Sequence, residues 1–239
     1  MDLRDFYDLD DEKCDKFEKY MNLLIEWNKN INLTAITDRD DIILKHFADS
    51  LTISKYIAHD CKVIDVGTGA GFPGIPLKVY NESLDITLLD SLNKRVNFLN
   101  DVIEKLDLKK ICAVHSRAED AAKNPKFREK FDVATSRAVA NLSTLVEYLL
   151  PFVKVNGICI CMKGPNVGEE LDKARKAIEV LGGRVEKVVN LRLKASNEEN
   201  TKDGVKIEYK EDKKGDKCSD LERNIIIIRK IKCCPNKYP

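Results

Sequence analysis

The stretch KVIDVGTGAGFPG at residues 62–74 constrains the fold more than any other part of the chain. A short apolar run ends in Asp65 and Val66 and is followed at once by Gly67, Gly69 and Gly71. Glycine has no Cβ, so a chain with this spacing can turn sharply and can let another molecule approach its peptide groups. A strand followed by a glycine turn and a helix is typical of α/β proteins that bind a nucleotide-like ligand at the turn.

Short apolar runs and amphipathic stretches alternate from residue 62 onward. We predict strands at 62–66, 85–90, 111–115, 131–136, 157–163, 184–191 and 224–231. Between them, the spacing of apolar residues predicts helices at about 94–105, 142–153 and 167–181. This alternation indicates an α/β fold with a mostly parallel sheet and helices on both of its faces.

The first 60 residues follow a different pattern. Apolar side chains recur at three- and four-residue steps in 12–29, and a second helical pattern runs through about 39–58. We therefore expect an N-terminal helical cap at 1–60, before a main domain at 61–239. Within that domain, 195–223 is almost entirely polar and is predicted to be an insertion carrying at most a short ribbon.

Composition excludes several classes of protein. The acidic first residues lack the apolar segment of a secretion signal, and no apolar run approaches the roughly 20 residues of a membrane span. The eight cysteines are scattered without a Cys-x-x-Cys pair, and the three histidines lie far apart in sequence. We expect a cytoplasmic protein with reduced thiols, no membrane partner and no metal site.

The net charge of +1 hides an asymmetry. Residues 1–60 contain 8 Lys and Arg against 14 Asp and Glu, or −6, and the rest of the chain carries +7. A polyanionic partner should therefore contact the main domain, although a charged face is more often simply solvated.

The glycine spacing separates two kinds of cofactor. A pyrophosphate is usually held by G-x-G-x-x-G at a helix start, whereas this chain has G-x-G-x-G followed by Pro73 and Pro76. Proline has no N–H to donate to a phosphate. S-adenosylmethionine, which has an adenosine but no phosphate, fits this turn better.

Acidic residues follow the next two predicted strands. Asp90 ends the second strand about 20 residues after the glycines, where a carboxylate can accept hydrogen bonds from both ribose hydroxyls. Ser91 follows it, and Ser91 or Asn93 can cap the next helix. Glu119 follows the third strand, where an adenine ring would rest. Alone, Asp90 could equally be a helix cap and Glu119 a solvated helix start.

Several motifs carry a family resemblance. They are WNKNINLTAIT (27–37), HFADSL (46–51), DVGTGAGFPGIPL (65–77), LLDSLNKRVNFL (88–99), SRAED (116–120), ATSRAVANL (134–142) and MKG (162–164). In this order they resemble the RsmG family, also called GidB, over about 15–194 and again over 221–231. These are class I, Rossmann-like, S-adenosylmethionine-dependent methyltransferases of bacteria.

The resemblance implies a reaction and a set of site residues. The substrate would be N7 of a guanosine in the decoding-centre loop of 16S rRNA, within the small ribosomal subunit. Gly67 and Phe72 would line the cofactor pocket, Ala118 and Glu119 would hold the adenosine, and Arg137 would approach the cofactor. Asp90 would be the acid on the ribose side.

The fourth predicted strand is consistent with that chemistry. It reads ATSRAV at 134–139, without the Asn/Asp-Pro-Pro-aromatic motif of amine methylation or the cysteine that cytosine C5 methylation needs. Guanine N7 has a free lone pair and loses no proton, so alignment and exclusion of water suffice and no catalytic residue is required.

Contacts with RNA and the roles of the N-terminal motifs stay open. Candidate RNA contacts are Arg95, Arg117, Arg137, Lys163 and Arg223, with Arg192 and Lys194 further out. Arg117 and Lys163 could instead form local ion pairs. His46 and Asp49 are either an acid–base pair or, more in keeping with their spacing, residues that pin the cap to the main domain. Residues 32–34 are either a substrate-side loop or a turn.

Two other functions remain compatible with such a fold. One is a methyltransferase that acts on a protein or a small molecule, and the other is a non-catalytic RNA-binding ribosome factor. The intact glycine loop with Asp90 and Glu119 argues against the second, and the motifs at 27–37 and 46–51 argue against the first. We expect a monomer.

Overall fold

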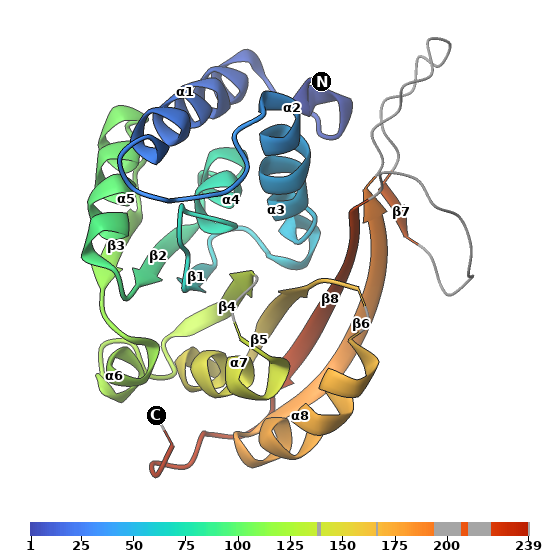
Figure 1. Cartoon of the computed structure of the whole chain (residues 1–239). Helices are drawn as coiled ribbons and strands as arrows, with labels where there is room; N and C mark the ends of the chain where they lie inside the picture. The colour runs from blue at the N-terminus through green and yellow to red at the C-terminus, as the bar shows by residue number, and fades with distance from the viewer. Residues whose placement is uncertain (138–139, 166, 194–206, 210–220, 239) are drawn as a thin grey trace.

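A single sheet with helices on both faces organises the chain (Figure 1). The computed structural model describes residues 1–137, 140–165, 167–193, 207–209 and 221–238. Its strands are β1 (Lys62–Val66), β2 (Asp85–Asp90), β3 (Ile111–His115), β4 (Phe131–Arg137), β5 (Val153–Lys163), β6 (Gly183–Leu193), β7 (Ile207–Tyr209) and β8 (Leu221–Lys230). They are ordered β3-β2-β1-β4-β5-β8-β6-β7.

Strand directions confirm the predicted mostly parallel sheet. The pairs from β3 to β5 are parallel, whereas β8 runs antiparallel to both β5 and β6, and β7 runs antiparallel to β6. The strand order reverses between β1 and β4, because β2 and β3 extend to one side and β5 to the other. Ligands of open α/β sheets bind beyond the carboxyl ends of the strands at such a reversal.

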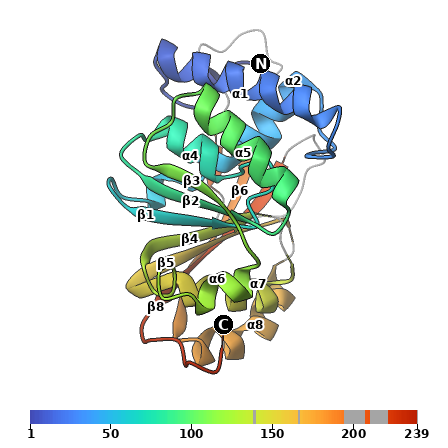
Figure 2. The ribbon, with the colours of Figure 1, turned by 90° about the vertical axis from the view of Figure 1, so that its left-hand side faces the viewer.

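Helices form a layer on each side of the sheet (Figure 2). One layer contains α1 (Asp11–Asn28), α2 (Arg39–Ile42), α3 (Asp49–Leu51), α4 (Gly74–Tyr80) and α5 (Asn93–Lys105). The other contains α6 (Ala118–Lys123), α7 (Leu142–Leu149) and α8 (Gly168–Val180). Because both faces are covered, β1 is apolar in consecutive positions: Val63 joins the core under α4 and α5, and Ile64 the core under α6 and α7.

The second helix of the N-terminal cap differs from the prediction. In place of one helix over 39–58, α2 leads into a π-helical segment, η2 (Ile43–Ala48), then α3 and a 3-10 turn, η3 (Ser54–Tyr56). Likewise the predicted 142–153 helix ends at Leu149 and continues as the 3-10 turn η4 (Leu150–Phe152). A fourth 3-10 or π element, η1 (Leu3–Asp5), precedes α1.

The polar insertion ends earlier in the sequence than predicted. Leu221, Glu222 and Arg223 belong to β8, because they pair with Leu193, Arg192 and Leu191 of β6. The ribbon expected inside the insertion is confirmed as β7, which pairs with β6. Lys194 and the remainder of the segment, 195–206 and 210–220, lie outside the described residues.

Candidate functional site

The glycine loop at the carboxyl end of β1 is left-handed at three positions. Gly67, Gly69 and Gly71 have φ of 67°, 63° and 96°. A Cβ on Gly71 would lie 2.8 Å from the hydroxyl of Tyr20, whereas a Cβ on Gly69 would meet nothing within 4 Å. Gly71 is therefore needed for packing against α1, and Gly69 borders open space in which a ligand can lie.

Asp90 holds this loop in place. Its Oδ2 accepts a hydrogen bond from the Gly69 N–H at 2.9 Å, and its Oδ1 accepts one from the Leu92 N–H, also at 2.9 Å. The Arg95 guanidinium lies 3.5 Å from Oδ2 and covers the carboxylate, of which 2% is exposed. Leu92, rather than Ser91 or Asn93, is the N-cap of α5, so the predicted side-chain cap was wrong.

The start of α4 is already occupied by a carboxylate of the chain. Asp65 Oδ2 accepts from the Gly74 N–H at 2.9 Å and from the Thr68 hydroxyl at 2.7 Å. Burial raises the pKa of Asp65 to about 6, and its Oδ1 is buried with no hydrogen-bond partner among the described residues. The first amide of α4 is thus unavailable to a phosphate, as the glycine spacing predicts.

The chain leads from the end of β3 into the start of α6. Ala118 and Glu119 are half-buried there, and Arg117 before them is exposed. Burial and the neighbouring Glu119 carboxylate raise the pKa of Tyr148. Across the sheet edge, the His115 ring lies 3.0 Å from the carbonyl of the exposed Ser91. Asp90 pairs with His115 in the register of β2 and β3, so these groups are neighbours.

Arg137, at the end of β4, is turned toward the N-terminal cap. Its Nη1 donates to Asp49 Oδ2 and to the Lys45 carbonyl, each at 3.0 Å, and its Nη2 donates to His46 Nδ1 at 3.1 Å. The guanidinium lies over the ring of Phe72, 4.8 Å from its centroid. Arg137 therefore joins the cap to the glycine loop.

His46 is neutral in this arrangement. Arginine has only donors, so His46 Nδ1 accepts and the proton lies on Nε2, which donates to Thr34 Oγ1 at 2.8 Å. Burial, and then the charge of Arg137, lower the pKa of His46 to about 3. The ring stacks on Phe72 with centroids 4.4 Å apart.

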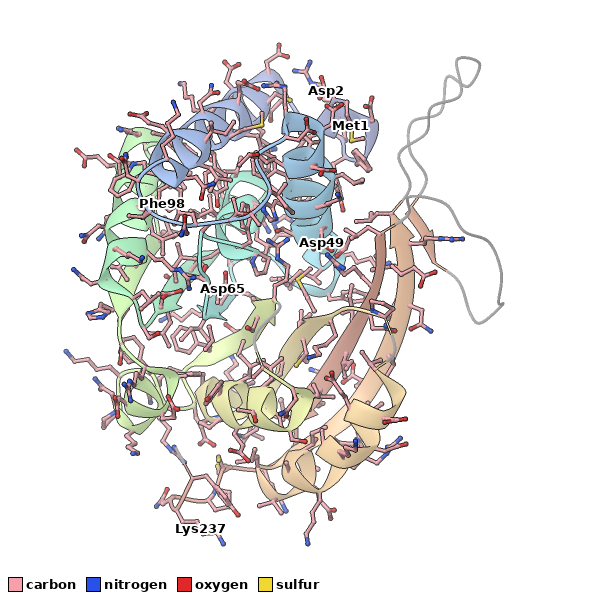
Figure 3. The ribbon with its side chains drawn as sticks, in the orientation of Figure 1. Met1, Asp2, Asp49, Asp65, Phe98 and Lys237 are labelled. Carbon is pink, nitrogen blue, oxygen red and sulfur yellow. The ribbon has the colours of Figure 1, made fainter. Side chains whose placement is uncertain are left out.

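Asp49 and the 32–34 segment have structural partners. Asp49 bonds both Arg137 and Arg223, which favours the role of pinning the cap over that of an acid–base pair. Figure 3 labels Asp49 and Asp65, both near the centre of the molecule, whereas Met1, Asp2 and Lys237 lie at its rim. Leu33 and Thr34 donate their N–H groups to Asn28 Oδ1, so they form a turn after α1.

The remaining predicted RNA contacts divide between exposed and paired side chains. Lys163 donates to the Ala140 carbonyl at 2.9 Å and lies 2.9 Å from Glu170. Arg192 lies 3.9 Å from Glu222. Arg117 is exposed, and Arg95 and Arg223 face Asp90 and Asp49. Sequence reasoning missed Tyr20 as a support of the glycine loop, since its spacing indicated only an apolar helix face.

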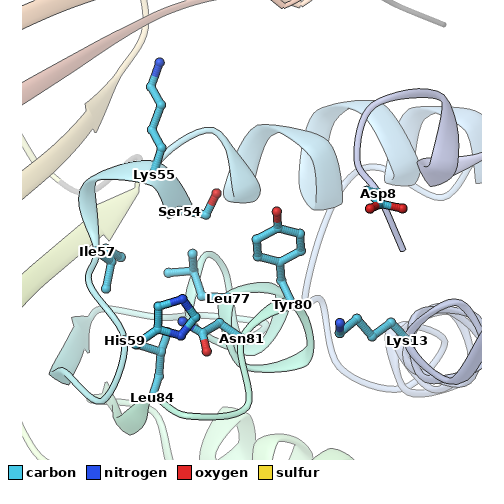
Figure 4. A pocket seen from close by; sticks show the side chains of 10 residues that line it. All are labelled: Asp8, Lys13, Ser54, Lys55, Ile57, His59, Leu77, Tyr80, Asn81 and Leu84. Carbon is cyan, nitrogen blue, oxygen red and sulfur yellow. The ribbon is translucent and has the colours of Figure 1, made fainter. Parts of the chain in front are cut away.

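A separate pocket lies away from these groups (Figure 4). It has a volume of about 460 Å³ and is lined by Asp8, Lys13, Ser54, Lys55, Ile57, His59, Leu77, Tyr80, Asn81 and Leu84. His59 and Leu84 come just before β1 and β2, so the pocket lies at the amino ends of the parallel strands. None of its residues belongs to the predicted site.

The described part of the chain lacks two kinds of feature. No helix in that part of the chain has the length and apolar character to span a membrane. The same residues contain no group of three or more His, Cys, Asp or Glu side chains arranged to hold a metal ion.

Methyltransferases are among the solved structures with this fold. M. jannaschii TYW2, solved in complex with AdoMet, matches with a TM-score of 0.53 and 12% identity over 77% of each chain. Precorrin-6y C5,15-methyltransferase from Geobacter metallireducens matches with a TM-score of 0.52 and 18% identity, over 77% of this chain and 87% of that one. The fold is that of a Rossmann-like methyltransferase.

Sequence relatives define the family within that class. A family model described as rRNA small subunit methyltransferase G matches residues 13–200. The Ribosomal RNA small subunit methyltransferase G of Desulforamulus reducens is 48% identical over 235 residues, which are 98% of this chain and 88% of that protein. The Clostridium tetani protein of the same name is 48% identical over 96% of this chain and 87% of its own length. The chain belongs to the rRNA small subunit methyltransferase G family, as the motifs predicted.

Proposed function

We propose that this methyltransferase transfers a methyl group from S-adenosylmethionine to N7 of a guanosine in the decoding-centre loop of 16S rRNA. The observation that carries the proposal is the bond from the Gly69 N–H to Asp90, at the carboxyl edge where the strand order reverses. Membership of the rRNA small subunit methyltransferase G family supports the substrate.

The residues at this edge fit an adenosine cofactor without phosphates. Open space borders Gly69, and an ionised carboxylate has about four lone-pair sites, so Asp90 can still accept from ribose hydroxyls once Arg95 moves aside. Gly67, Gly69, Gly71 and Phe72 would line one side, Asp90 and Ser91 the ribose, and Ala118 and Glu119 the adenine. Arg137 would approach from β4. When bound, S-adenosylmethionine supplies a methyl group activated by its positively charged sulfur.

Neither candidate acid–base residue is free to take a proton. Both ring nitrogens of His46 are bonded and its pKa is about 3, while both oxygens of Asp49 accept from arginines. Attack by guanine N7 releases no proton, so it needs no base. The contribution of the chain is then to bind, orient and exclude water.

The substrate base should lie in an RNA loop, because the major-groove edge that carries N7 is hidden in an A-form helix. Arg117 is the exposed candidate for a phosphate contact, and the other candidates, Arg95, Arg137, Lys163 and Arg223, are partly buried. Cytoplasmic location and a monomeric state remain predictions.

The test uses purified protein, methyl-labelled S-adenosylmethionine and small ribosomal subunits from cells that lack this modification. After digestion of the RNA, we expect the label in 7-methylguanosine derived from 16S rRNA. Label in another nucleoside would reject the position. A protein that binds the cofactor but leaves RNA unlabelled would reject the substrate and favour a protein or small-molecule acceptor.

A further inference from the structure

The carboxylate of Asp49 joins the N-terminal cap to two strands at once. It is 0% exposed, and its two oxygens accept from different arginines: Oδ2 from Arg137 Nη1 and Oδ1 from Arg223 Nε, each at 3.0 Å. Arg137 ends β4, and Arg223 lies one residue before Asn224, which pairs with Lys163 at the end of β5. Both guanidinium groups therefore lie at the carboxyl edge of the sheet.

Further contacts fix how each guanidinium is oriented. Arg137 also bonds the Lys45 carbonyl and His46 and lies over Phe72, and 12% of its side chain is exposed. Arg223 donates its Nε–H to Asp49 at 3.0 Å and an Nη1 N–H to the Glu222 carbonyl at 3.3 Å, and 23% of its side chain is exposed. With His46 neutral, Asp49 and its two arginine partners together carry a net charge of +1.

We propose that Asp49 is a positioning residue for methyl transfer, which acts through Arg137 and Arg223 by fixing both guanidiniums at the mouth of the site. The inference rests on the proposed function, in which these arginines contact the cofactor and the RNA. Charges held in place before substrates bind need no reorganisation during the reaction. A displacement of about 1 Å can lower a rate roughly 100-fold.

The first test variant is Asp49→Asn. Its amide nitrogen would face an arginine N–H, so at least one of the two bonds is lost together with the negative charge. We expect kcat/KM on small subunits to fall roughly 10- to 100-fold while the protein stays folded. The matched control is Asp41→Asn, which removes a half-exposed carboxylate paired with Lys45 on the same segment, and which should leave kcat and KM unchanged.

A second variant covers the case in which Asp49→Asn fails to fold. Arg223→Lys keeps the positive charge but replaces the planar guanidinium fork, which bonds Asp49 and the Glu222 carbonyl, with a compact ammonium that does not hold the Asp49 carboxylate in the same geometry. We expect KM for small subunits to rise severalfold, with the melting temperature close to that of the wild type, because Arg223 is partly exposed near the start of β8.

A double-mutant cycle of Asp49 and Arg137 distinguishes a positioning role of Asp49 from a merely structural one. If Asp49 acts through Arg137, adding Asp49→Asn to Arg137→Ala should lower kcat much less than it does in the wild type. The inference is overturned if Asp49→Asn and Arg223→Lys change only the melting temperature and leave kcat and KM unchanged at a temperature where each is folded. An inactive wild-type protein would instead reject the proposed function, and the inference with it.

Discussion

Two buried ionisable side chains, His46 and Asp65, illustrate how single residues set the pH response of this protein. Burial lowers the pKa of His46 to about 3 and raises that of Asp65 to about 6. In both cases the low polarity of the interior favours the neutral form. The consequences for stability have opposite signs, because one neutral form has lost a proton and the other has kept it.

The acid response of His46 can be isolated. Its folded pKa lies below its unfolded value of 6.5, so its contribution is complete above pH 6.5 and is lost as the pH falls toward 3. Between pH 7.5 and 5 this group alone should lower the free energy of unfolding by about 2 kcal/mol. Urea denaturation at both pH values should show that loss in the wild type.

The matched variant is His46→Asn, whose amide oxygen can still accept from Arg137. In that variant the loss between pH 7.5 and 5 should be smaller by about 2 kcal/mol, since no group at position 46 titrates. Asp65 changes stability in the opposite direction over this range, but it is present in both proteins and cancels in the comparison. An equal loss in the two proteins would contradict the assignment of a buried neutral imidazole.

At the scale of elements, α1 supports the glycine loop through Tyr20. The fully buried Tyr20 donates its hydroxyl to the Ala70 carbonyl and packs on the ring of Phe72, with centroids 5.5 Å apart. Tyr20→Phe keeps the ring but leaves that carbonyl without this bond. We expect a loss of about 1–3 kcal/mol in the free energy of unfolding. Affinity for S-adenosylmethionine should fall roughly tenfold as the loop loosens.

The control for this variant is Tyr7→Phe, because the Tyr7 hydroxyl donates to the Ala48 carbonyl at 3.0 Å, within the cap. It should lower stability without changing cofactor affinity by calorimetry. If both variants change the affinity equally, or neither does, Tyr20 has no particular role in holding the loop.

Strand bounds were predictable because both faces of the parallel sheet are buried. The runs at 62–66 and 85–90 coincide with β1 and β2, in which every residue after the first is buried, and the run at 111–115 coincides with the edge strand β3. The helix at 39–58 was wrong because the π-helical segment over Ile43–Ala48 shifts the apolar face, which a period of 3.6 residues does not represent.

The candidate site, like the fold, was predictable from the sequence only in part. The sequence brought the glycine loop, Asp90 and Glu119 together because the ends of consecutive parallel strands must meet at one edge. The bond between Asp49 and Arg223 joins residues 174 positions apart, and it depends on β8 inserting between β5 and β6. No local pattern specifies that insertion, so sequence reasoning placed Arg223 at the end of a polar loop.

For the molecule as a whole, the polar insertion bridges two neighbouring strands of one sheet. Leu193 and Leu221 are register partners of β6 and β8, so the chain leaves and re-enters the sheet at adjacent positions. Paired residues of antiparallel strands lie only about 5 Å apart, a span that a short turn can close. The 27 residues between them are therefore not needed to connect the strands.

Deletion of residues 203–217 tests this at the scale of the whole chain. It removes β7 and leaves 12 residues to join Leu193 to Leu221, so the β6–β8 pairing and the bond from Arg223 to Asp49 should survive. Halving the length of a connection lowers its loop-closure cost by about 0.6 kcal/mol. We expect cofactor affinity by calorimetry within about twofold of the wild type. A matched variant replaces the same residues with Gly and Ser at unchanged length. If only the deletion weakens cofactor binding, the shorter connection strains β8. If both variants weaken it, residues 203–217 themselves contribute to the site.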